Sequence, residues 1–245
     1  MRLLLKVAIP LALVLALVPV FERRTPVAES AMGFETGDFS EASSLQAKAG
    51  GSLTVTGERA YEGSKSARAT WSGGSTGAQR VWKDTNWNNG SDVWYGMAVY
   101  VPSNTDYCYW NPIRWDNYDL YGGVDDNKPG EGDVGGLTVE QNRISIMKNH
   151  YGGEEQKLVD GGTLAKGRWT WLELHQRFSD RDGEALSELY VDGQKRGAST
   201  KANSAGRQIT DLRAGAVAIA SKCSTPSAID FDRVSISNSQ RGPRG

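Results

Sequence analysis

The chain has 245 residues, with 28 Lys and Arg against 29 Asp and Glu, so its formal net charge is −1. A near-neutral chain has no general attraction for nucleic acid or anionic lipid, and we expect no nucleic-acid partner. The 29 glycines make up about 12% of the 245 residues, above the average of ~7%. Apolar stretches nevertheless persist along the chain, which indicates a turn-rich β protein rather than a disordered one.

The N-terminus resembles a targeting or anchoring segment. Arg2 and Lys6 precede a run from Val7 to Phe21 that contains no charged residue. This run is shorter than the ~20 residues that a membrane-spanning helix needs, and it is typical of a signal peptide. A retained membrane anchor is the alternative, and both predict export of the remaining chain. We expect residues 1–32 to comprise this leader and a short linker.

The expected export also bears on the state of the two cysteines, Cys108 and Cys223. An oxidising compartment favours a disulfide between them. Two buried free thiols are the alternative.

Residues 33–240 have the pattern of a single β domain without helices. Short apolar runs between Gly and Ser clusters predict strands at 52–57, 66–71 and 78–83. The run 93–101 is apolar on both faces, because Val93, Tyr95 and Met97 alternate with Trp94 and Ala98.

The second half continues this pattern. Residues 136–147 predict a hairpin that turns at Gln141 and Asn142. Leu172 and Leu174 alternate with polar and aromatic residues in the next strand, and Asp192-Gly193 predicts another hairpin. Strands at 216–220 and 229–237 follow, and a change of apolar parity in the last one predicts a bulge. Such spacing is typical of a sandwich or barrel. Residues 241–245 are expected to form a loose tail.

Several stretches resemble known jelly rolls. "GRWTWLELHQRF" with "ELYVDGQ" is similar to paired strands of concanavalin A-like lectins and glucanases. "GFETGDFSEAS" and "IDFDRVSIS" resemble their bracketing strands, and also those of carbohydrate-binding modules. "DVWYGMAVYVPS" resembles a strand of the heparin-lyase-like polysaccharide lyases. The order of these stretches implies a jelly-roll β-sandwich of two antiparallel sheets.

The resemblance also implies candidate catalytic positions. In those lyases the strand after this segment presents Gln-Trp-His, and the histidine takes part in catalysis. The matching triplet here is Arg114-Trp115-Asp116, which lacks the imidazole.

Most Trp and Tyr residues lie between Trp82 and Tyr121. Aromatic rings can stack on sugars, while Arg, Asn and Asp can bind the hydroxyl groups. A glycan groove is therefore one interpretation of this region, and filling of the core is the other. The candidate substrate-binding residues are Trp82, Trp94, Tyr100, Trp110, Trp115, Tyr118 and Lys148.

β-Elimination on a uronate polymer needs neutralisation of the carboxylate, a base for the C5 proton and an acid for the leaving oxygen. Arg80 and Arg114 could hold the carboxylate, and Arg114 with Asp116 could equally form a salt bridge. His150 or Tyr151 could supply the base and the acid. His175 is interpreted as a structural histidine between Glu173 and Arg177. Paired carboxylates with glucanase spacing are missing.

Modules of this kind often join their first and last strands through one Ca²⁺ with oxygen ligands. Glu35 and Asp232 occupy the matching positions, and a pair of acids without metal is the alternative. No organic cofactor is expected.

Together these features predict an exported, monomeric protein that contacts an acidic polysaccharide, with the membrane involved only through the N-terminal segment. The expected activity is that of a polysaccharide lyase. A non-catalytic lectin-like module at the cell surface is the alternative, and a structural or protein-binding sandwich is a third class.

Overall fold

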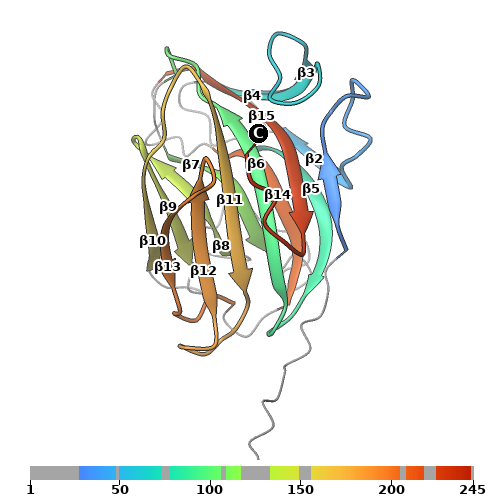
Figure 1. The fold of residues 1–245 in the computed structure, drawn as a ribbon. Coiled ribbons are helices and arrows are strands. Elements are labelled where there is room, and N and C mark those ends of the chain that lie inside the picture. The colour runs from blue at the N-terminus through green and yellow to red at the C-terminus, as the bar shows by residue number, and fades with distance from the viewer. Residues whose placement is uncertain are drawn as a thin grey trace, which may run out of the picture.

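The computed structural model describes residues 28–47, 50–72, 78–105, 109–116, 133–148, 156–204, 208–217 and 225–243, and among these it leaves out the side chains of 78–84, 133–134 and 217. Within these ranges the chain forms strands and turns without a helix, so none of these segments could cross a membrane as a helix. The strands form two antiparallel sheets that lie face to face (Figure 1). The predicted all-β sandwich is confirmed.

Sheet A has the strand order β13-β12-β11-β6-β15-β4-β3, and β1 also pairs with β15. Its strands are β1 (Ser30–Met32), β3 (Gly51–Thr56), β4 (Ser66–Trp71), β6 (Asp92–Tyr100), β11 (Trp169–Arg177), β12 (Leu186–Val191), β13 (Gln194–Ser199) and β15 (Ser227–Ser237).

Sheet B has the strand order β10-β9-β8-β7-β14-β5-β2. Its strands are β2 (Ser44–Ala47), β5 (Ala78–Trp87), β7 (Tyr109–Asp116), β8 (Asp133–Glu140), β9 (Arg143–Lys148), β10 (Gln156–Thr163) and β14 (Ile209–Val217). Successive strands β4 to β7 alternate between the two sheets, so the chain crosses the sandwich repeatedly.

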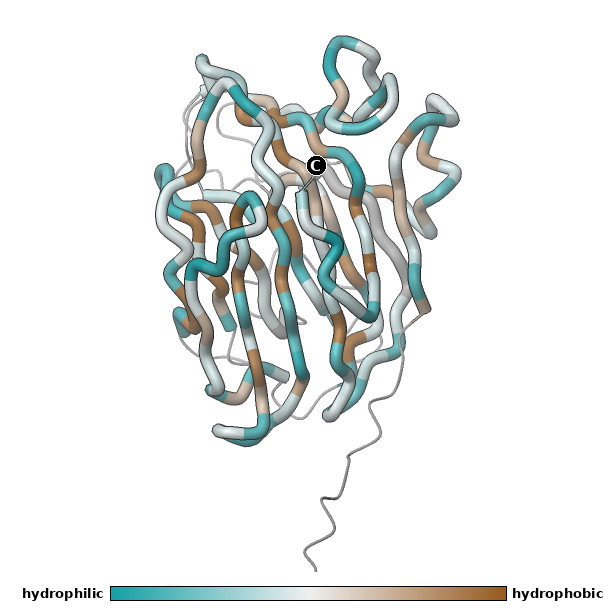
Figure 2. The backbone as a smooth tube through the Cα atoms, viewed as in Figure 1, coloured by the Kyte–Doolittle hydropathy of each residue, from teal (hydrophilic) through white to brown (hydrophobic). Residues whose placement is uncertain are grey.

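The core lies between the sheets because each strand turns one face inward. On β6 the residues Val93, Tyr95, Met97 and Val99 are buried in the core, as their spacing predicts. Hydrophobic and hydrophilic segments alternate along the strands in Figure 2. Each sheet therefore also has an outer face, which points away from the core and carries most of its polar side chains.

The predicted hairpins are confirmed. β8 pairs with β9 through a turn at Gln141, whose φ is 56°. β12 pairs with β13 through Asp192 and Gly193, with φ values of 51° and 76°. Two consecutive residues with positive φ give a turn whose twist matches that of the strands.

The predicted bulge in the last strand is also confirmed. The pairing of β15 with β6 shifts between Asp232 and Ser235, and Arg233 in between has a φ of 49°. This extra residue explains why Phe231 and Val234 both reach the core although three positions separate them.

Several strands differ from the prediction. β1 lies at 30–32, at the end of the predicted linker, and β2 at 44–47 was not predicted. β10 was not predicted, because Gly161 and Gly162 near its end are typical of a turn. A Cβ atom on Gly161 would lie 2.3 Å from Leu189 Cδ2, so close packing against β12 requires the glycine. β14 begins at Ile209, well before the predicted 216–220, because its charged residues obscure the apolar alternation.

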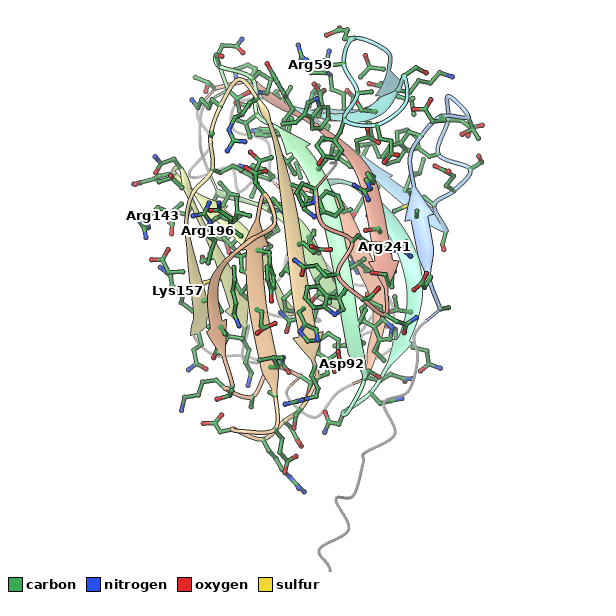
Figure 3. The ribbon with its side chains drawn as sticks, in the orientation of Figure 1. Arg59, Asp92, Arg143, Lys157, Arg196 and Arg241 are labelled. Carbon is green, nitrogen blue, oxygen red and sulfur yellow. The ribbon has the colours of Figure 1, made fainter. Side chains whose placement is uncertain are left out.

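The C-terminal residues 238–243, called the strap below, cross the outer face of sheet A. The buried Glu173 carboxylate accepts backbone hydrogen bonds from Arg241 (2.6 Å) and Gly242 (3.2 Å). Arg233 donates to the Gly242 carbonyl at 3.3 Å, and Arg241 lies in front of the sheet in Figure 3. The expectation of a loose tail from residue 241 is therefore wrong for Arg241 and Gly242.

Candidate functional site

The outer face of sheet B brings two oppositely ordered motifs together. β7 contributes Arg114 and Asp116, and β14 contributes Asp211 and Arg213. Their neighbours Trp115 and Leu212 are core residues, so alternation turns the four charged side chains away from the core. The register pairs Arg213 with Arg114, and Asp211 with Asp116. We call these four residues the charged cluster.

Like charges lie directly opposite each other in this register, an arrangement that is unfavourable alone. The side chains therefore interact with opposite charges on other positions. Arg213 Nε lies 3.0 Å from Asp116 Oδ2 and 2.7 Å from Asp211 Oδ2, and Arg114 Nη2 lies 3.8 Å from Asp116 Oδ1. Arg213 thus joins both carboxylates of the cluster.

The members of the charged cluster differ in exposure. The side chains of Arg213 and Asp116 are 1% and 0% exposed, whereas that of Arg114 is 13% exposed. Buried ion pairs are costly to desolvate, and they persist only when the charges are well compensated. The arrangement therefore holds Arg114, the most exposed of the four, above a fixed set of charges. Asp116 forms ion pairs with the guanidinium groups of Arg114 and Arg213, which is the salt-bridge alternative of the sequence analysis.

Sequence reasoning identified Arg114 and Asp116 but missed Asp211 and Arg213. A signal was present, since "DLR" at 211–213 reverses the charge order of "RWD" at 114–116. Two such triplets on antiparallel neighbours bring each charge beside its opposite on the diagonal. The pairing of β7 with β14 could not be deduced without the fold.

Other predicted residues of the site are only partly described. Arg80 and Trp82 are β5 residues paired with Gly215 and Arg213 on β14, but their side chains lie outside the described part. Tyr118, His150 and Tyr151 lie outside the described residues. Cys108 and Cys223 lie outside them too, so their disulfide stays a prediction.

Trp110 and Trp115 do not line a groove. Both side chains are 0% exposed and belong to the core. The Trp115 ring lies 5.7 Å from that of Tyr95 and 6.3 Å from that of Phe178, between centroids. A ring without exposed surface cannot stack on a sugar, so the prediction that these two rings bind substrate is wrong. They take the alternative role, which is filling the core.

Trp94 and Tyr100 lie on the other sheet. Both are half-buried on the outer face of sheet A, so they do not share a groove with Arg114. Trp94 stacks on His175 with centroids 4.2 Å apart, and the Arg59 guanidinium lies 4.4 Å from the Tyr100 ring centre. The prediction of one groove containing Trp94, Tyr100 and Arg114 is wrong.

Lys148 also faces away from the charged cluster. It is 6% exposed and has the same strand parity as Ile144 and Ile146, which are core residues. Burial lowers the pKa of Lys148, and Asp182 and Asp180 in sheet A's loop partly oppose that effect. Its predicted contact with substrate beside Arg114 is therefore corrected.

His175 is a structural residue, but its partners differ from those expected. Its Nε2 lies 2.6 Å from Asp92 Oδ1, and its Nδ1 lies 2.9 Å from Glu188 Oε2. Both ring nitrogens face carboxylates, so both carry protons when the two bonds form. Burial alone would lower the pKa of His175, yet the hydrogen bonds to Asp92 and Glu188 outweigh it and raise the pKa above 6.5.

This arrangement predicts a pH-dependent contribution to stability. Because the pKa of His175 is raised in the folded state, its stabilising effect should be complete below the unfolded value of ~6.5 and should disappear as the pH rises through the folded pKa. Thermal unfolding of the wild type and His175→Gln across this range should give curves that converge at high pH. An NMR titration of the two histidines checks the assignment, with His150→Gln as the control. A stability difference that grows with pH would contradict this account.

The candidate Ca²⁺ ligands Glu35 and Asp232 both bind the loop 57–65, which joins β3 to β4. Glu35 accepts backbone hydrogen bonds from Ser64 and Lys65, at 3.0 and 2.9 Å. Asp232 accepts them from Tyr61 and Glu62, both at 2.9 Å. Burial raises the pKa of Asp232 to about 6 despite these bonds.

The groups around these two carboxylates are N–H donors, which bind the carboxylates themselves and cannot be ligands of Ca²⁺. Within the described ranges no three His, Cys, Asp or Glu side chains converge as metal ligands. The Ca²⁺ site stays a prediction that these residues alone do not complete.

The two stacked sheets and the charged outer face of sheet B define a jelly-roll β-sandwich whose polar face could contact a charged ligand. Residues 34–218 match the family model described as Polysaccharide lyase. The chain belongs to this polysaccharide lyase family. No curated protein matches the sequence.

Solved structures share the fold. An endo-β-1,4-glucuronan lyase from the fungus Trichoderma reesei is similar with a TM-score of 0.67 and 12% identity, over 89% of this chain and 98% of that one. The alginate lyase vAL-1 from Chlorella virus gives 0.55 and 10%, over 80% and 99%. The globular domain of T. cruzi calreticulin gives 0.58 and 12%, over 89% and 90%. At these identities the likeness shows the fold alone.

Proposed function

We propose that this protein is a lyase that cleaves a uronate-containing polysaccharide by β-elimination. Membership of the polysaccharide lyase family implies a polysaccharide substrate. The observation that carries the finer proposal is the charged cluster, which holds the Arg114 guanidinium at the outer face of sheet B. A guanidinium can bind a carboxylate through two parallel hydrogen bonds, so a uronate is the sugar that this group suits.

In the proposed reaction Arg114 neutralises the carboxylate at C5 of the uronate and so acidifies the C5 proton. A base takes that proton, the electron pair forms the C4–C5 double bond, and the C4–O bond breaks. An acid protonates the leaving oxygen. His150 or Tyr151 is proposed for the base and the acid, and Arg80 as a second cation for the carboxylate.

The structural neighbours indicate which polymers to test. Two of them act on glucuronan and on alginate, as their names state, and both polymers consist of uronates. We propose the same class of substrate here. The uncharged run Val7–Phe21 supports export of the protein, so that the polymer is met outside the cytoplasm.

The test is incubation of the full-length protein with glucuronan, alginate, heparin and hyaluronan. The ultraviolet absorbance of the unsaturated uronate should rise with at least one polymer. Retention on immobilised polymer without any rise would favour the lectin-like alternative. The absence of both retention and a rise in absorbance would favour the structural or protein-binding class.

A further inference from the structure

Two consecutive glycines, Gly135 and Gly136, lie beside the charged cluster on β8. The register pairs Gly135 with Trp115 and Gly136 with Arg114. Because successive residues of a strand point to opposite faces, Gly135 faces the core and Gly136 faces outward. Neither residue is among those with positive φ, so backbone freedom does not explain the glycines. The explanation is the lack of room for a Cβ atom at either position.

A Cβ atom at each of the two positions would meet different groups. A Cβ atom on Gly135 would lie 2.6 Å from Trp115 Cζ2 and 2.8 Å from the Met147 carbonyl oxygen. A Cβ atom on Gly136 would lie 3.0 Å from Arg114 Cγ and 3.0 Å from the Ile113 carbonyl oxygen. The first clash is severe and involves the core. The second is tight, and it involves the aliphatic part of Arg114.

The position of Arg114 Cγ shows which way this side chain leans. Arg114 on β7 pairs with Gly136 on the neighbouring strand β8 and with Arg213 on the other neighbouring strand, β14. Its Cγ lies close above Gly136, so the side chain starts towards β8 and away from the like charge of Arg213. Asp116 on its own strand forms a longer ion pair with the guanidinium, with Nη2 and Oδ1 3.8 Å apart.

We propose that Gly136 is a positioning residue that sets the direction of the Arg114 side chain. The substrate carboxylate is then received above β7 and β8, and the side towards β14 is left to the buried ion pairs of Arg213. This assignment rests on the proposed function, because it takes Arg114 as the group that binds the uronate. It adds the subsite where the carboxylate lies and the residue that determines this place.

The test compares Gly136→Ala with Gly135→Ala. Gly136→Ala should lower kcat/KM on the polymer by about 10-fold. This is less than the ~10²-fold cost of a ~1 Å displacement, because the 3.0 Å contact requires Arg114 Cγ to move by only a few tenths of an ångström. The Tm of Gly136→Ala should fall less than that of Gly135→Ala, because the contacts of the added Cβ atom begin at 3.0 Å at Gly136 and at 2.6 Å at Gly135. Gly135→Ala should lower Tm by about 5–10 °C through overpacking of the core, with a smaller loss in kcat/KM of the folded protein.

A double-mutant cycle separates a positioning role from a folding defect. The effect of Gly136→Ala on Tm should be smaller in an Arg114→Ala background, because the contact with Cγ is then removed. The Arg114 side-chain N–H signal in an NMR spectrum should shift in Gly136→Ala and stay in place in Gly57→Ala, whose added Cβ atom would meet only the Ser64 carbonyl oxygen, at 3.7 Å.

Unchanged kcat/KM in folded Gly136→Ala, with Arg114→Gln inactive, would overturn the positioning role and leave the proposed function intact. An inactive wild type would refute the proposed function. The NMR shift and the cycle would still decide whether Gly136 directs Arg114, and an unmoved Arg114 signal would overturn that assignment.

Discussion

Replacing Arg213 by methionine should lower the free energy of unfolding by about 3–5 kcal/mol, the usual cost of removing one partner from a buried ion pair. Asp116 and Asp211 face each other in the register of β7 and β14. Arg213 Nε lies 3.0 and 2.7 Å from their carboxylates, and its side chain is 1% exposed. Without it, two buried negative charges would repel each other. Urea unfolding with an unchanged m-value measures the loss.

A matched control is Arg143→Met. Arg143 pairs with Asp160 on the same sheet, but both side chains are about half exposed, at 53% and 47%. Such pairs contribute about 0–1 kcal/mol. Adding Asp116→Asn to Arg213→Met should restore part of the stability, because it removes one of the two opposed charges. Equal losses for Arg213→Met and Arg143→Met would show that the cluster does not hold the sheet together.

Replacing Arg114 by glutamine should lower kcat/KM on a uronate polymer by about 10²–10³-fold, the effect of losing one donor to a developing negative charge. Most of the loss should appear in kcat, because the charge on the carboxylate grows in the transition state. Arg114→Lys should recover little, since an ammonium cannot reproduce the two-point geometry. Steady-state kinetics with the best substrate measures both variants.

Stability should change much less than activity in this variant. Arg114 is the most exposed member of the charged cluster, and its contact with Asp116 is longer, at 3.8 Å, than those of Arg213. Arg143→Gln removes a positive charge from the same sheet and should leave kcat/KM nearly unchanged. If Arg114→Gln kept full activity, the uronate carboxylate would have to be bound elsewhere.

The fold was largely predictable because core-facing and outward-facing residues alternate along the strands of a sandwich, and this alternation is visible in the sequence. Val93, Tyr95 and Met97 alternate with outward residues, and Asp192-Gly193 allows only a few turn geometries. β10 and β14 were missed or displaced, because Gly161 and Asp211 break the apolar alternation that identifies a strand. In both strands the tertiary neighbours, rather than local propensity, require these residues.

The candidate site was less predictable. Arg114 and Asp116 could be found from a triplet, but their partners on β14 are about a hundred positions away in the chain. Aromatic composition alone does not identify a sugar-binding site, since a tryptophan that binds a sugar and one that fills a core look alike in sequence. Trp115 differs from an exposed ring only through the parity of β7, which places it beside Leu212 in the core.

The strap brings the two ends of the described chain to the same side of the molecule. Glu29 accepts a hydrogen bond from the Asn238 backbone at 3.3 Å and also pairs with Arg241. Both ends therefore meet at sheet A, across the sandwich from sheet B, to which β7 belongs (Figure 1). A bead or tether coupled near Glu29 or Pro243 would leave the opposite surface unobstructed. If the proposed function holds, the immobilised protein should still act on long polymers.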